Sequence, residues 1–132
     1  MIVLLAAHPI VRGRDSSEAI AQVRSFTGQA FRASGASIAP VLVLPSDFIS
    51  LEPRYAWQFG PTTARREVGG WLQGATTRTG RGRVAFFGEA AMFSAQVAGP
   101  NRTPMGMNAP LAEQNPQFVL NTLHWLAGVI DP

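Results

Sequence analysis

The sequence predicts a single α/β domain that combines short buried strands with a closing helix. Three observations support this prediction: apolar runs rich in β-formers, a Gly-rich turn at residues 79–82 between two of these runs, and a well-punctuated helix near the C-terminus. At 132 residues the chain can bury a core but is small for a complete doubly wound sheet, because parallel strands need crossover helices. We therefore expect one domain over residues 1–132.

Four apolar runs are the expected strands of one mixed sheet, at residues 2–7, 39–44, 71–78 and 83–87. The first run stops at His8, because the following Pro9 holds the preceding residue extended and cannot donate to a central ladder. The last two runs flank the Gly-rich turn, and this arrangement is typical of a β-hairpin that leads into a buried strand.

The closing helix is expected at residues 117–127, with its apolar stripe packed on the sheet. Asn115 is the predicted N-cap, Pro116 occupies the first helical position, and Gly128 follows the end of the helix. The residues of the expected stripe are Val119, Leu120, Leu123 and Leu126.

Two connecting stretches have distinct patterns. Within residues 48–61, Tyr55, Trp57 and Phe59 recur at a spacing of two, which predicts a loop followed by a strand with one aromatic face. Residues 98–110 are rich in proline, glycine and asparagine and are expected to form a long irregular loop. Loops of that length are usually functional or disordered.

Composition excludes several kinds of chemistry and partner. Cysteine is absent, which removes disulfides, thiolate catalysis and cysteine-ligated zinc. All 11 basic residues are arginine and they are scattered along the chain, so we expect no nucleic-acid partner. The apolar start is too short for a membrane span and lacks the features of a signal peptide, and the compartment stays open. With 46% hydrophobic and 14% charged residues, the chain leaves room for burial against a partner.

Glu89 and His8 are the candidate catalytic residues, because each follows the end of an expected buried strand. A carboxylate and an imidazole at one sheet edge would be the minimum for acid/base chemistry with water as the nucleophile. The alternative for Glu89 is a capping role at the following helical turn, where the helix dipole favours an anion. The alternative for His8 is a hydrogen-bonded structural role.

Candidate ligand-binding residues lie after the last strand and before the closing helix. They could line a crevice at the carboxyl ends of the strands, or, in the case of Asn115, simply cap the helix. No metal site and no cofactor are predicted, because no histidine has the short spacing that metal motifs need. The candidates are Ser94, Gln96, Asn108, Glu113 and Asn115.

Three segments, AAHPIVRG, GRGRVAFFGEAAMF and NPQFVLNTLHWLAG, resemble the C-terminal half of bacterial domains of the class I glutamine amidotransferase-like superfamily. The similarity is greatest to the uncharacterised branch related to gliding-motility and intraflagellar-transport domains. The resemblance implies a partial flavodoxin-like α/β sandwich, with relatives that are exported or envelope-associated. It also implies a half-domain, since the family's first βα units have no counterpart here.

The resembled enzymes use a cysteine nucleophile, and this chain has none, so their activity does not carry over. Three hypotheses follow. The chain is a catalytically inert amidotransferase-like module that binds a small polar ligand or a protein partner, a small hydrolase that uses Glu89 and His8, or a structural oligomerisation domain. An uncovered sheet edge in a half-domain also predicts a homodimer.

Overall fold

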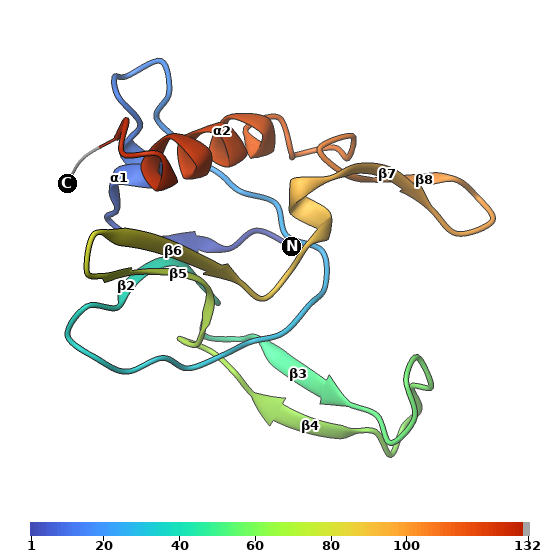
Figure 1. Cartoon of the computed structure of the whole chain (residues 1–132). Coiled ribbons are helices and arrows are strands. Elements are labelled where there is room, and N and C mark those ends of the chain that lie inside the picture. Colours follow the sequence, from blue (N-terminus) through green and yellow to red (C-terminus); the bar gives the residue numbers. More distant parts are fainter. Residues whose placement is uncertain (131–132) are drawn as a thin grey trace.

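The computed structural model describes residues 1–130, and its fold is mixed α/β with strands predominating (Figure 1). The main sheet has four strands in the order β1-β2-β5-β6. They are β1 (Leu4–Leu5), β2 (Ala39–Val43), β5 (Leu72–Thr79) and β6 (Gly82–Phe87). All four expected strands are therefore present in one sheet.

The expectation of a mixed sheet is wrong, because each pair of neighbouring strands in this sheet is antiparallel. Parallel neighbours need a long crossover, usually a helix. Between β1 and β2 the chain forms only the single turn α1 (Pro9–Arg12) and then irregular backbone, and between β2 and β5 it forms a hairpin. Each strand therefore runs in the opposite direction to the strand beside it in the sheet.

The predicted hairpin is confirmed in β5 and β6, which pair from Thr79↔Gly82 to Gly74↔Phe87. Gly80 and Arg81 make the two-residue turn between the strands. Gly80 has φ +57°, a left-handed conformation that glycine adopts without a Cβ penalty, and two-residue hairpin turns require such a residue.

Helix α2 (Asn115–Leu126) confirms the expected closing helix, and Gly128 follows its end with φ +79°. The predicted N-cap is wrong: Gln114 occupies the cap position and Asn115 is the first helical residue. The side chain of Asn115 instead reaches Arg24, accepting from its N–H at 3.0 Å and donating to its carbonyl at 2.8 Å. The Asn115 amide thus supplies hydrogen-bond partners to backbone groups of an irregular segment, where such groups would otherwise lack them.

The predicted packing face of α2 is also wrong. Leu120, Leu123 and Leu126 are 43%, 56% and 38% exposed. The buried face alternates apolar and amide side chains, because α2 covers both the apolar sheet and the irregular segment that follows α1. Its buried residues are Asn115, Phe118, Asn121, Thr122 and Trp125.

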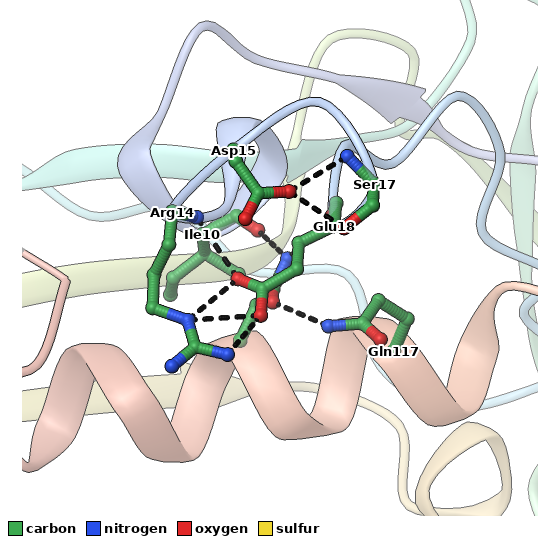
Figure 2. A network of polar contacts seen from close by, with 7 residues as sticks. Ile10, Arg14, Asp15, Ser17, Glu18 and Gln117 are labelled. Carbon is green, nitrogen blue, oxygen red and sulfur yellow. Dashed lines mark hydrogen bonds and ion pairs between the residues drawn. The ribbon is translucent and has the colours of Figure 1, made fainter.

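Figure 2 shows how α2 holds the segment after α1. Asn121 Nδ2 donates to the carbonyls of Ile10 and Glu18, both at 2.9 Å, and Gln117 Nε2 donates to Asn121 Oδ1 at 2.9 Å. The Glu18 carboxylate accepts from the backbone N–H of Arg14 at 2.9 Å and from its guanidinium. These bonds from Arg14 lower the pKa of Glu18 to about 2.

Two hairpin arms project from the body in Figure 1. One pairs β3 (Ile49–Glu52) with β4 (Ala64–Glu67), and the other pairs β7 (Ala95–Ala98) with β8 (Thr103–Gly106) after the short 3₁₀ helix η1 (Ala91–Phe93). The predicted aromatic strand is wrong, since Tyr55, Trp57 and Phe59 lie in the loop between β3 and β4, and Trp57 is 82% exposed. The predicted irregular loop at 98–110 is partly the second hairpin.

The hydrophobic core lies between the main sheet and α2. Phe87 of β6 contacts both Phe93 and Phe118, with ring centroids 4.8 and 5.7 Å apart, and Phe118 is 1% exposed. Such edge-on contacts add to the stabilisation from burial. Among residues 1–130, no helix has the length and apolar character that crossing a bilayer would demand.

Candidate functional site

Glu89 lies two residues after the end of β6 and is 6% exposed. Its carboxylate accepts from the backbone N–H groups of Ala91 at 2.5 Å and Met92 at 3.2 Å, at the start of η1. It also accepts from Ser25 Oγ at 3.3 Å. Both carboxylate oxygens are therefore used to cap η1 and to tie it to the segment around Ser25. This is the capping alternative to a catalytic role.

Replacing Glu89 by glutamine is expected to lower the free energy of unfolding by about 1–3 kcal/mol. The amide has one accepting oxygen, so one of the buried N–H groups of Ala91 and Met92 would face an NH₂ group. Urea unfolding measures the loss, and Glu113→Gln is the matched control, because Glu113 is exposed and its one hydrogen bond within residues 1–130 is from the N–H of Leu111 at 3.1 Å. Equal effects of the two substitutions would contradict the capping role.

His8 is the N-cap residue of α1 and is 8% exposed. Its Nδ1 accepts from the N–H of Ile10 at 3.1 Å, which leaves the proton of the neutral ring on Nε2. Nε2 lies 2.8 Å from Thr76 Oγ1 and donates to it in this tautomer. Burial lowers the pKa of His8 to about 4, so the ring is neutral at pH 7. Its ring also contacts Trp125, with centroids 5.7 Å apart.

The structure does not bring Glu89 and His8 together. The described partners of His8 are in α1, β5 and α2, whereas those of Glu89 are in η1 and at Ser25. The two side chains share no partner among the described residues. Hydrolysis by this pair needs both groups within hydrogen-bond reach of one water, and the geometry does not provide this.

Of the five predicted ligand residues, four use their side chains to hold neighbouring segments in place, and Gln96 takes part through its backbone carbonyl. Ser94 Oγ donates to the carbonyl of Ala91 at 2.9 Å, and Asn108 Nδ2 donates to the carbonyl of Gln96 at 3.4 Å. Glu113 bonds within its own turn, and Asn115 binds the backbone of Arg24 as described above. These residues position η1, the β7–β8 arm and the start of α2.

A groove of about 570 Å³ lies instead between the β3–β4 arm and the body of the domain. Every residue from 48 to 53 lines it, as does every residue from 26 to 30, but no residue of β4 does. Side chains of a strand alternate between its two faces. A cavity that touches six consecutive residues therefore runs along the edge of β3, not beneath one face of the arm.

The backbone edge of β3 that borders this groove has no strand partner among residues 1–130. The N–H of Val68 donates to the carbonyl of Phe48 at 3.0 Å, and the register continues with Ser50↔Arg66 and Glu52↔Ala64. Because antiparallel pairs alternate, the backbone groups of Ile49 and Leu51 point away from β4 and toward the groove.

Gln73 of β5 also lines the groove and is 2% exposed. Its Nε2 donates to the carbonyl of Thr27 at 3.2 Å, and its Oε1 accepts no hydrogen bond within residues 1–130. A buried acceptor without a partner costs about 1–3 kcal/mol, so this polar side chain is not explained by stability. Strand β5 also contains Thr76, Thr77 and Arg78, so the polar type of Gln73 gave no distinct signal of this groove in the sequence.

The described chain holds no group of three or more His, Asp or Glu side chains arranged to bind a metal ion. No protein-family model, curated protein or solved structure matches this chain.

Proposed function

We propose that this chain is a catalytically inert, amidotransferase-like module that binds a protein partner by holding an extended peptide segment of it in the groove beside β3. The observation that carries the proposal is the unpaired edge of β3 along the whole groove. The separate capping roles of Glu89 and His8 and the absence of cysteine favour binding over catalysis. The flavodoxin-like relationship belongs to the same proposal and is supported only by the three resembling segments.

An extended peptide suits this groove because of what its walls present. A strand added beside β3 pairs with the outward backbone groups of Ile49 and Leu51, and such main-chain bonds supply affinity without a fixed sequence. The side chains of Ile49 and Leu51 are 48% and 43% exposed and offer apolar contacts to alternate residues of the peptide. The groove therefore favours apolar, β-forming segments.

The test uses an end-blocked hexapeptide of alternating valine and threonine as the probe. We expect the probe to slow amide hydrogen exchange at Ile49 and Leu51, because both N–H groups become hydrogen-bonded. A peptide of the same sequence with alternate backbone amides methylated serves as the first control and should not bind, since it lacks the donors and space for pairing. Protection that persists with the methylated peptide would contradict strand addition.

Two proline variants sharpen the test. Leu51→Pro removes an N–H that points into the groove, whereas Arg65→Pro removes the matching N–H on the far edge of β4, since Leu51 pairs with Arg65. We expect Leu51→Pro to abolish binding of the probe and Arg65→Pro to retain it. Equal binding by the two variants would rule out the edge of β3 as the site.

We also propose that the chain forms a homodimer, the assembly expected of an oligomerisation domain. The observation that favours it is the uncovered edge strand β6, beside which several large apolar side chains are exposed. The low proportion of charged residues, 14%, supports the same assembly.

A further inference from the structure

Strand β6 is an edge strand without the features that normally protect such edges. It lies at the end of the order β1-β2-β5-β6, and its six residues, GRVAFF, contain no proline and no lysine. Its pairing with β5 is regular, without a bulge, whereas β2 and β5 pair with register shifts. The opposite edge strand, β1, has only two residues. An exposed and regular edge of this kind readily pairs with another strand.

The hairpin register shows which backbone groups of β6 face outward. The two-residue turn closes on the pair Thr79↔Gly82, which is hydrogen-bonded in hairpins of this length. Hydrogen-bonded and non-hydrogen-bonded pairs alternate from this pair onward. The backbone groups of Val84 and Phe86 therefore bond to β5, and the backbone N–H and carbonyl of Ala85 point away from the sheet. Ala85 is thus at the centre of the open edge.

Apolar side chains are exposed on the face of β6 that does not meet α2. Val84 is 37% exposed and Phe86 is 50% exposed. They share this face because they lie two residues apart on one strand. Phe87, on the other face, packs against Phe118 of α2.

Helix α2 runs antiparallel to β6 over this other face. Near the start of β6, Arg83 Nη1 donates to the carbonyls of Trp125 and Ile130, both at 2.8 Å, at the end of α2. Asn121 bonds to the carbonyls of Ile10 and Glu18, so its side of α2 faces α1. Gln117, which bonds to Asn121, lies on the same side of the helix (Figure 2). Helical geometry places Leu123 and Leu126 on the opposite side, the side of the β6 edge, where they are 56% and 38% exposed.

The geometry points to a second copy of this chain as the occupant of this edge, joined through β6 about a two-fold axis at Ala85. This inference rests on the proposed homodimer and specifies its interface. Antiparallel pairing of β6 with its copy sets Ala85 opposite Ala85, and it sets Val84 opposite Phe86 of the other copy. The two main sheets become one continuous sheet.

This pairing covers both exposed apolar groups at once. On one face, Val84 and Phe86 of each copy pack against those of the other. On the opposite face, the two α2 helices come alongside each other across the axis, so that Leu123 and Leu126 are buried. Stable interfaces bury roughly 800 Å² on each partner, and the two flanking apolar layers extend the buried surface beyond the strand edge itself.

Charge does not oppose this contact, although the chain carries a net charge of +3. The one charged residue within β6 is Arg83, and its guanidinium is bound to the carbonyls of Trp125 and Ile130. No like-charged side chains are therefore brought face to face along the shared edge. A second copy is favoured over an unrelated protein because this register sets the apolar Val84 and Phe86 of one copy opposite the same two residues of the other.

The test uses single cysteines, each unique in a chain that has none. Val84→Cys and Phe86→Cys are prepared separately, mixed and oxidised mildly. Residues opposite each other in a non-hydrogen-bonded pair have Cα atoms about 4.5 Å apart, which allows a disulfide. We expect the mixture to give a disulfide-linked heterodimer. Each variant alone should link poorly, because its two cysteines are diagonal neighbours roughly 7–8 Å apart.

Val97→Cys mixed with Phe86→Cys is the matched control. Val97 lies on the β7–β8 arm and is 49% exposed, so its cysteine is equally accessible but outside the interface. Equal linking in the control mixture would show random collision and overturn the register.

Sedimentation of Phe86→Lys provides an independent measurement. Phe86 is half exposed, so the monomer should tolerate lysine, and we expect the dimer Kd to rise at least tenfold, with Val97→Lys unchanged. If Phe86→Lys remains dimeric and the mixture of Val84→Cys with Phe86→Cys forms no disulfide, this interface is overturned and the homodimer proposal stands. A wild-type monomer at several hundred micromolar would overturn both.

Discussion

Replacing Phe118 by alanine is expected to lower the free energy of unfolding by about 3–5 kcal/mol, the usual loss for a buried phenylalanine. Phe118 is 1% exposed and contacts the rings of Phe87 and Phe93, with centroids 5.7 and 6.2 Å away. The substitution removes these ring contacts and leaves a cavity between α2 and the sheet. Urea unfolding followed by circular dichroism measures the loss.

Leu120→Ala is the control on the same helix. Leu120 is 43% exposed and is expected to lose less than about 1 kcal/mol when truncated. The apolar stripe inferred from the sequence predicts the opposite order, with Leu120 in the core. A larger loss at Leu120 than at Phe118 would therefore contradict the observed rotation of α2.

Acidification is expected to destabilise the protein through His8, by about 2 kcal/mol between pH 7.5 and pH 5 and about 3 kcal/mol by pH 4. Burial lowers the pKa of His8 from 6.5 to about 4 in the folded chain. Between these two values the unfolded chain binds the proton and the folded chain does not, so stability falls as the pH falls. Above pH 7 both states are neutral and stability is independent of this group.

Urea unfolding at pH 7.5, 6 and 5 measures this effect. The control is His8→Asn, which keeps a good N-cap residue for α1 but does not titrate. Its unfolding free energy should fall much less than that of the wild type over this range, because the substituted side chain binds no proton. The same pH dependence in both proteins would contradict the assignment to His8.

Local patterns predicted the central hairpin and the C-terminal end of α2 well. The turn at Gly80 and the β-forming runs on either side of it depend on residues close in sequence, and so does Gly128 after the end of the helix. Turn chemistry and helix stops are local properties, which one sequence contains in full.

Long-range partners account for the errors. Asn115 looks like a cap in the sequence, but its side chain is needed by Arg24, 91 residues away. The rotation of α2 depends in the same way on Asn121, which bonds to Ile10 across 111 residues. No periodicity in α2 reveals that it covers an irregular segment as well as a sheet.

The candidate site was predicted only in part. Glu89 and His8 were predicted to act as a catalytic pair at strand ends; both are buried, and each hydrogen-bonds to different residues. The groove beside β3 was missed because its walls, residues 26–30 and 48–53, come from separate irregular and edge segments without a motif.

The hydrogen bonds from α2 also bear on how the chain folds as it is synthesised. The irregular segment after α1 has few partners of its own, and amide groups of Gln114, Asn115 and Asn121 supply them across 91 to 111 residues. The β5–β6 hairpin can form as soon as it leaves the ribosome, because its contacts are local. The hydrogen bonds from α2 to the first quarter of the chain cannot form until α2 has been synthesised, so this segment stays accessible to chaperones and proteases for longer than the hairpin does.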